Sequence, residues 1–413
     1  MVLYLVAFLD RVNISFAALT MNRDLGIGDS LFGLAAGIFF VGYFIFEVPS
    51  NLILARLGAR RWIMILMIVW GITSVATAFV RGPQLYILLR FLLGLAESGF
   101  FPGIILYLTF WFPPSVRSSI MALFAAAIPV SNLLGAPISA QILALGNWGG
   151  LRSWQWLFIL EGAPAIVLGG LVFFLLPDKP QDVPWLSREE KAALAKELGP
   201  ATPQSPQTDS FLHSFLARPA IYAWSLAYFM LALGLYGLGF WIPKVLVSHG
   251  LTLKGTGWAT AAPYLVAVVG MVLWTRRADR DLARSADREG GWRVNLALAY
   301  LAAGVGFAIA GLAPNAAIAI AGFSLAAVGI LTSMPLFWSS CTLRLAGPTV
   351  AAYIALINAI GNLGGFAGPV AMGWLRETTH SYALGLCATG LCLAGGAALV
   401  AQLARPAPLH AAR

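Results

Sequence analysis

The stretch of sequence that decides the fold is residues 86–110, which read YILLRFLLGLAESGFFPGIILYLTF. Only two of these residues, Arg90 and Glu97, carry a charge. A helix that crosses a bilayer needs about 20 mostly apolar residues, because lipid offers no water to satisfy the polar groups of the backbone. The stretch is long and apolar enough, so it predicts a transmembrane helix that contains two charges.

The rest of the chain has the same apolar character. Of its 413 residues, 59% are hydrophobic and 10% are charged, whereas a soluble domain is about a quarter charged. The apolar runs predict an all-α integral membrane protein with twelve transmembrane helices in two six-helix bundles. We expect these helices near residues 2–19, 30–54, 62–80, 86–110, 118–143, 156–176, 221–246, 256–274, 294–312, 316–343, 350–375 and 382–403.

A single long polar segment separates the sixth apolar run from the seventh. Within it, Ser187 precedes Arg188, Glu189 and Glu190, a pattern that predicts a capped, charged surface helix. Two sets of six helices are typical of transporters that rock two related halves about a substrate site at their interface. The predicted domains are an N-terminal six-helix bundle (1–176), a cytoplasmic linker (177–219) and a C-terminal six-helix bundle (220–413).

The basic residues indicate how the chain is oriented. Cytoplasmic loops carry the excess of Lys and Arg, and with the N-terminus inside, the inner loops and C-terminal tail hold 18 of the 26 basic residues, against 6 outside. We therefore expect both termini in the cytoplasm and the protein in a bacterial inner membrane. The basic residues are scattered through short loops, so the net charge of +9 does not predict a nucleic-acid partner.

The first apolar run begins at Met1 with neither a polar leader nor a signal-peptide cleavage site. We expect that this N-terminus is truncated or misassigned. The cysteines Cys341, Cys387 and Cys392 lie in apolar segments without metal-ligand spacing, and the four histidines lie in or near loops. The sequence therefore does not predict an enzyme, a metal or a cofactor, and we expect a monomer whose partners are an organic anion and the bilayer.

Two charges lie midway along the first apolar run. Asp10 and Arg11 are followed by Asn13, and a charge at the bilayer centre costs at least ~2.5 to 3.5 kcal/mol, so such residues usually face a cavity or a partner. Adjacent helical residues point about 100° apart, so the two need not pair with each other. One interpretation is a structural ion pair with neighbouring helices; the one we favour is a proton site at Asp10 beside an anion contact at Arg11.

Arg90 and Glu97 form the second charged pair. Their spacing of seven residues places both side chains on one helix face, about 10 Å apart along the axis. Burial disfavours the charged form of a carboxyl group, whereas Arg stays charged, so an Arg that holds a carboxylate and an acid that carries a proton suit a proton-coupled anion carrier. The alternative is a buried bridge between Arg90 and a carboxylate that only ties helices together.

Two further acids lie in predicted spans. Glu47 lies near the end of the second helix, close to Arg56, and Glu161 precedes Gly162 in the sixth. We favour gating or structural ion pairs for both over contact with substrate, because snorkelling to an interface is open to them. Polar-capable residues within spans, each more often an interhelical hydrogen-bond partner than a ligand contact, are Tyr43, Trp241, Trp338, Asn132, Asn358 and Asn362.

Taken together, these segments resemble the anion:cation symporter family of the major facilitator superfamily. The likeness covers essentially the whole chain. It is carried by residues 9–13 (LDRVN), 42–51 (GYFIFEVPSN), 58–62 (GARRW), 90–102, 156–162 (WLFILEG), 236–241 (YGLGFW) and 358–362 (NAIGN).

The resemblance implies a function and a set of site residues. The family imports organic anions such as sugar acids, tartrate, phthalate and other aromatic acids, generally with protons. The implied proton-coupling residues are Asp10 and Glu97. The implied substrate contacts are Arg11, Arg90, Tyr43, Trp338 and Asn358.

The loop after the second helix resembles the gating motif of the superfamily and has a weak echo after the eighth helix. The expected gating residues are Glu47, Arg56, Arg60, Asp279 and Arg280. Two departures from the family pattern matter. Ala55 stands where the loop motif usually has Asp, so this gate is weakened or shared with Asp279. Ile128 and Pro129 stand where some relatives bind sugar acids with Gln, which favours tartrate-like or aromatic acids.

Three functions remain open on the sequence alone. The first is a proton symporter that imports a small organic anion. The second is an anion exchanger or uniporter that uses no protons, and the third is a transporter-like sensor that binds ligand without transport. Proton-dependent uptake separates the three, because an exchanger needs anion inside and a sensor shows no flux.

Overall fold

The computed structural model describes residues 1–113, 126–198, 219–284, 288–344 and 350–403, together with residues 116, 120 and 124. Within these residues the chain is helical, and its one extended pairing is the isolated bridge between Trp148 and Leu151. The helices are α1 (Val2–Leu25), α2 (Asp29–Leu57), α3 (Ala59–Thr77), α4 (Pro83–Glu97), α5 (Phe100–Trp111), α7 (Ala127–Ala144), α8 (Ser153–Leu175), η1 (Pro180–Asp182), α9 (Arg188–Leu198), α11 (Pro219–Ser248), α12 (Leu253–Arg284), α13 (Arg288–Gly311), α14 (Ala316–Arg344), α15 (Val350–Asn362), α16 (Gly364–Thr379) and α17 (Ala383–Leu403).

The predicted helical membrane fold is confirmed. Eleven helical segments in the described part of the chain are long and apolar enough to cross a bilayer, and one of them, Pro83–Trp111, comprises α4 and α5. The run predicted at 350–375 falls short as a single helix because it divides at Leu363 into α15 and α16. The run predicted at 118–143 is described continuously only from residue 126, where α7 follows, and its earlier residues lie largely outside the described part.

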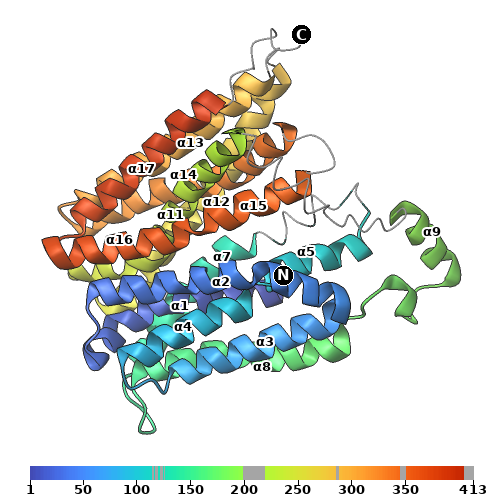
Figure 1. The fold of residues 1–413 in the computed structure, drawn as a ribbon. Coiled ribbons are helices and arrows are strands. Elements are labelled where there is room, and N and C mark those ends of the chain that lie inside the picture. Colours follow the sequence, from blue (N-terminus) through green and yellow to red (C-terminus); the bar gives the residue numbers. More distant parts are fainter. Residues whose placement is uncertain are drawn as a thin grey trace. The chain divides into compact units, whose positions relative to one another are not determined.

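The contacts between Cα atoms divide the chain into two compact units, Met1–Ser205 and Pro206–Arg413. In the first unit, α3 packs along α8, α2 along α4, and α1 against both α7 and α8. Figure 1 shows α1 to α4 and α8 side by side in this unit. In the second unit, α13 packs between α14 and α17, and α11 contacts α14, α15, α16 and α17.

Two close helix crossings in the first unit depend on glycine. A Cβ atom at Gly94 of α4 would overlap the backbone carbonyl of Phe39 on α2, so these helices can approach this closely only without a side chain there. A Cβ atom at Gly162 of α8 would lie 2.9 Å from the Cβ and Oγ atoms of Ser74 on α3. Both crossings lie beside the charged residues within the spans.

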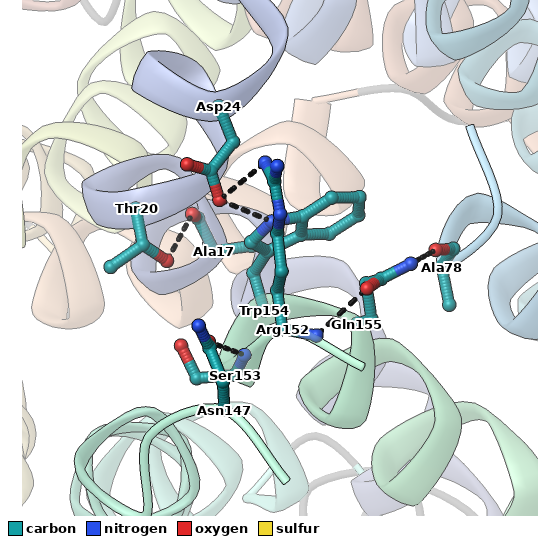
Figure 2. A network of polar contacts seen from close by, with 9 residues as sticks. All are labelled: Ala17, Thr20, Asp24, Ala78, Asn147, Arg152, Ser153, Trp154 and Gln155. Carbon is teal, nitrogen blue, oxygen red and sulfur yellow. Dashed lines mark hydrogen bonds and ion pairs between the residues drawn. The ribbon is translucent and has the colours of Figure 1, made fainter. Parts of the chain in front are cut away.

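A network of polar contacts joins three helices at one end of the first unit (Figure 2). The Asp24 carboxylate at the end of α1 accepts a hydrogen bond of 2.9 Å from Trp154 Nε1 and pairs with Arg152 Nη1 at 3.0 Å. The Gln155 side chain donates to the Ala78 carbonyl at 2.6 Å and accepts from the Arg152 backbone N–H at 2.8 Å. The start of α8 is thereby tied to the ends of α1 and α3.

The polar segment after α8 contains the predicted surface helix. The Glu190 N–H donates to Ser187 Oγ at 3.1 Å, and the Ser187 N–H donates to Glu190 Oε2 at 2.8 Å, which is a capping box at the start of α9. Figure 1 shows α9 standing away from the other helices of the first unit, beyond the end of α5. Residues 199–218 of the predicted linker lie outside the described part.

Candidate functional site

The centre of the candidate site is an ion pair between α1 and α4. Arg11 Nη2 donates to Glu97 Oε2 at 2.6 Å, and Arg11 Nε donates to the same oxygen at 3.2 Å. Glu97 is 2% exposed, and its second oxygen, Oε1, is buried without a hydrogen-bond partner in the described part of the chain. One carboxylate oxygen therefore holds Arg11 while the other has unused acceptor capacity.

Aromatic rings surround the Arg11 guanidinium. Its central carbon lies 4.9 Å from the ring centroid of Phe8, 5.0 Å from that of Phe39 and 5.6 Å from that of Tyr43. A cation over an aromatic face is attracted by the ring quadrupole, and the attraction strengthens where water is excluded. The rings therefore stabilise a cation at this position even when its carboxylate partner is neutralised.

Arg90 approaches the same Phe39 ring from α4. Its guanidinium carbon lies 5.2 Å from the ring centroid, and its Nε donates to the Ala35 carbonyl at 3.3 Å. The residue is 1% exposed, yet its Nη1 and Nη2 atoms have no hydrogen-bond partner among the described residues. Glu97, on the same helix, pairs with Arg11 and forms no salt bridge with Arg90. Arg90 is thus a buried cation with unused donors.

Asp10 lies next to Arg11 in sequence but has a different set of partners. Its Oδ1 atom accepts a hydrogen bond of 3.0 Å from Asn13 Nδ2 and a second from Ser74 Oγ on α3. Its Oδ2 atom is buried without a hydrogen-bond partner in the described part. Asp10 also interacts electrostatically with Glu97 and Arg90. The expectation that Asp10 and Arg11 need not pair with each other agrees with this geometry.

Glu161 adds a third buried carboxyl group from α8. Its Oε1 atom accepts a hydrogen bond of 2.7 Å from Ser139 Oγ on α7. Among the described residues Glu161 forms no salt bridge, and its Oε2 atom has no hydrogen-bond partner. In the described part of the chain Glu161 therefore lacks the expected ion pair and is 6% exposed, and a gating role for it stays a prediction.

The shape of the fourth span places Glu97 beside a break. The helix predicted as one run over 86–110 has turn geometry at Ser98 and Gly99, between α4 and α5. A Cβ atom at Gly99 would overlap the Ser50 hydroxyl group of α2, so close packing of α2 accompanies the break. Glu97 is the last residue of α4, close to the middle of the span Pro83–Trp111.

Three of the expected gating residues, Arg56, Arg60 and Arg280, lie near the ends of helices, whereas Glu47 lies inside α2. Arg56 is exposed at the end of α2 and Glu47 is half-buried on the same helix. Arg280 is exposed on α12, and the Asp279 side chain lies outside the described part.

Arg60 and the turn before α3 have a partner that sequence reasoning missed. The Arg60 backbone N–H donates to Asp178 Oδ1 at 2.9 Å, and the Arg60 side chain donates to the Phe173 carbonyl. Gly58 at this turn has a φ of 84°, and a Cβ atom there would lie 3.1 Å from Asp178 Oδ1. Asp178 therefore supplies a carboxylate at the loop where Ala55 replaces the usual Asp.

The two expected contacts in the second unit lie among aromatic and small residues. The Trp338 ring on α14 lies 4.9 Å from the Tyr228 ring and 5.3 Å from the Phe337 ring, between centroids. Asn358 is half-buried on α15, four residues before that helix ends at Asn362. Trp338 and Asn358 share their unit with neither arginine of the candidate site.

Sequence reasoning found the charged residues of the site but missed four of their partners. Ser74 contacts Asp10, Ser139 contacts Glu161, and the Phe39 ring lies beside both arginines. Asp178 contacts the loop before α3. Ser and Phe are common in transmembrane helices, so nothing in the local sequence marks the first three. Asp178 was detectable, because it is an acid directly after an apolar run.

Comparison with known proteins identifies the family. The sequence profile of the Major Facilitator Superfamily matches residues 1–369. Two proteins of Agrobacterium vitis, each named "Putative tartrate transporter", are 48% and 47% identical to this chain over 99% of its length, which covers 89% and 92% of the respective relatives. Both relatives therefore align over nearly their whole length.

A solved structure shares the fold. It is a bacterial homologue of the human lysosomal transporter Spinster in an inward-facing, unoccupied conformation, with a TM-score of 0.77 at 18% identity over 98% of this chain and 95% of that one. At this identity the likeness concerns the fold alone. The profile match and the relatives named as transporters show an integral membrane transport protein rather than an enzyme. The chain belongs to the Major Facilitator Superfamily.

Proposed function

We propose that this protein is a secondary active transporter that imports a small organic anion, a carboxylate such as a tartrate-like or aromatic acid, by proton symport and alternating access. Two relatives at 47% and 48% identity are named for tartrate transport, which supports an organic anion as substrate. The proton coupling is inferred from the charged residues of the first unit. Its proposed carriers are Asp10 and Glu97.

The observation that carries the proposal is the state of Arg90. A guanidinium that is 1% exposed keeps two terminal nitrogens without hydrogen-bond partners in the described part of the chain. An unsatisfied buried donor is costly, and more so when it is charged. A carboxylate matches the planar fork of Arg bidentately and supplies the missing acceptors. The arrangement therefore favours an anionic ligand over a neutral sugar.

The Arg11–Glu97 pair provides a way to couple that ligand to a proton. While Glu97 is charged, it neutralises Arg11 and competes with any anion for it. A proton on Glu97 removes this competition and leaves the Arg11 cation among its aromatic rings. Anion binding and protonation of Glu97 are then mutually favourable, which is the thermodynamic requirement for symport.

The position of the two arginines favours a dicarboxylate. Arg11 and Arg90 approach one Phe39 ring, at 5.0 and 5.2 Å from its centroid. A tartrate-like substrate carries two carboxylates, one for each guanidinium. An aromatic monocarboxylate would use one arginine and stack on Phe8, Phe39 or Tyr43 instead. Tyr43, Trp338 and Asn358 are the proposed further substrate contacts, and no cofactor besides the proton takes part.

The proposed setting is a bacterial inner membrane with both termini in the cytoplasm. The excess of Lys and Arg in the loops on that side supports the orientation. We assign Glu47, Arg56, Arg60, Asp279 and Arg280 to gating. The two bundles are proposed to extend over 1–176 and 220–413, joined by a cytoplasmic linker. A monomer is the proposed transporting unit.

Uptake into proteoliposomes tests the function. The purified protein is reconstituted, and accumulation of labelled L-tartrate is followed with an inward proton gradient, without one, and with one collapsed by a protonophore. Symport predicts accumulation only with the intact gradient. A gradient-independent exchange that requires anion inside the vesicles would show an exchanger, equilibration without exchange would show a uniporter, and binding without flux would show a sensor.

A thermal-shift screen identifies the anion. A ligand that binds the folded state raises its melting temperature, so dicarboxylates, aromatic monocarboxylates and sugar acids are compared at equal concentration. Stabilisation by tartrate and its stereoisomers above aromatic acids supports the dicarboxylate assignment. The opposite order would assign the site to aromatic acids.

A further inference from the structure

Asn13 lies near two buried acids, Asp10 and Glu161, neither of which belongs to the Arg11–Glu97 ion pair. Its Nδ2 atom donates to Asp10 Oδ1 at 3.0 Å, and its side chain lies close to the Glu161 carboxyl group. Asp10 and Glu161 interact electrostatically with each other. The three residues come from α1 and α8, two helices that pack together.

The cluster has more acceptors than donors. Asp10 Oδ2, Asn13 Oδ1 and Glu161 Oε2 are all buried and have no hydrogen-bond partner in the part of the chain that the structure describes. Asp10, Asn13 and Glu161 are 1%, 1% and 6% exposed. Buried polar atoms are nearly always paired, because an unmade hydrogen bond is costly away from water. A proton on either carboxyl group creates the O–H donor that this cluster lacks.

The charges around the two acids differ. Asp10 interacts electrostatically with Arg90 and Glu97 on α4, whereas Glu161 forms no salt bridge among the described residues. Ser74 of α3 and Ser139 of α7 contact the acids but do not titrate. The α3–α8 crossing at Gly162, next to Glu161, holds Ser74 close to this pair. Two carboxylates without a shared cation cannot both be charged cheaply in a dry site.

The geometry points to Asp10 and Glu161 as a coupled pair of proton sites with Asn13 beside them, and to Glu161 as a further proton-carrying residue of the transport cycle. This rests on the proposed proton symport. When the proton passes between the acids, one carboxyl O–H bond breaks and the other forms, so the pair keeps a single negative charge. The protonation of Asp10 depends on the anion site through Arg90 and Glu97. The protonation of Glu161 depends on that site through Asp10.

Glu161→Gln tests the pair, because an amide keeps the size of the acid but cannot release a proton. Ser139→Ala is the matched control: it removes the hydrogen bond between α7 and α8 and leaves the acid in place. For both variants and the wild type, labelled L-tartrate uptake driven by a proton gradient is measured over a range of external pH, beside counterflow without a gradient.

Loss of proton-driven accumulation in Glu161→Gln, with counterflow retained and proton-driven accumulation kept in Ser139→Ala, supports the proposal. A Glu161→Gln variant with wild-type accumulation and pH profile overturns it and leaves symport intact. Equal losses of uptake in both variants, with an unchanged pH profile, also overturn it. They would show that Glu161 only stabilises the contact between α7 and α8. A wild type that shows no proton-driven uptake instead refutes the proposed function itself.

Glu161→Asp keeps the test decisive if the glutamine variant does not fold. The shorter acid retains a titratable proton but moves it away from Asn13. The coupled pair predicts driven uptake with a shifted pH profile for this variant. A folded Glu161→Asp protein with an unshifted profile contradicts the pairing.

Discussion

The two units differ in what they bury. Among the described residues, the spans of the first unit bury the charged side chains Asp10, Arg11, Arg90, Glu97 and Glu161, whereas those of the second bury Lys244, near the end of α11. Neutral hydrogen bonds join other helices of the second unit. Tyr300 donates from its hydroxyl group to the Ala227 carbonyl at 2.8 Å, and Trp274 Nε1 donates to Asn295 at 3.1 Å.

This difference indicates which unit binds the anion and the proton. A charge within a span is costly and is retained mainly where it binds or moves an ion. The first unit has several such charges with unused donors and acceptors, so it is the proposed seat of anion binding and proton coupling. We propose that the second unit contributes neutral substrate contacts through residues such as Trp338 and Asn358.

The largest effect is expected from Arg90→Ala. It removes the always-charged donor that fits a carboxylate bidentately, and loss of a charge-assisted pair of this kind costs about 2 kcal/mol or more, which is roughly 30-fold or more in Kd. Arg90→Lys should also impair binding, because a point charge lacks the planar fork. Direct binding of labelled anion to purified protein measures both variants.

Arg152→Ala is the matched control for the Arg90 variants. Arg152 belongs to the same unit, but its side chain is half exposed and pairs with Asp24 at the end of α1. It should leave anion affinity unchanged. Wild-type anion affinity in Arg90→Ala would show that Arg90 has a structural role. Arg11 would then be the first candidate for the anion contact, and the anion site would still belong to the first unit.

A smaller effect is expected from the second unit. Trp338→Ala and Asn358→Ala each remove a neutral contact worth about 1 kcal/mol, so the Kd should rise about fivefold while coupling to the proton gradient persists. The measurement is the ratio of gradient-driven to gradient-free uptake beside the Kd. If either variant uncouples transport from the gradient at normal affinity, the division of roles between the units is wrong.

The smallest effect on anion affinity is expected at the helix crossing that places Arg90 on Phe39. Gly94→Ala inserts a Cβ atom into the Phe39 carbonyl, and overpacking of this kind costs about 1 to 3 kcal/mol. A lower melting temperature and a weaker affinity should appear together. Gly170→Ala on α8 is the control, because no atom lies within 4 Å of its added Cβ. Equal melting temperatures for the two variants would mean that α2 and α4 separate without cost.

The sequence predicted much of this arrangement because charge and hydropathy are local signals. An apolar run predicts a span wherever it occurs, and a charge inside it is visible without a structure. The spacing of seven residues placed Arg90 and Glu97 on one face of α4, and both are buried. The capped helix α9 followed from Ser187 and Glu190 alone.

The pairing of these charges was not predictable, because it depends on which helices become neighbours. Arg11 and Glu97 are 86 residues apart in sequence and Asp10 and Ser74 are 64 apart, and no periodicity links such positions. Local patterns gave Arg90 a possible carboxylate bridge, whereas Glu97 pairs with Arg11 instead. The division of the predicted 350–375 helix at Leu363 was also missed, because its hydropathy continues across the break.

The central claim is that the acids beside the buried arginines carry the transported proton. It is tested most directly by comparing gradient-driven uptake with counterflow in proteoliposomes that contain Glu97→Gln or Asp10→Asn. An amide imitates the protonated acid but cannot release a proton, so both variants should bind the anion and exchange labelled for unlabelled anion while losing accumulation driven by a pH gradient. Wild-type proton-driven accumulation in both single variants would contradict the account.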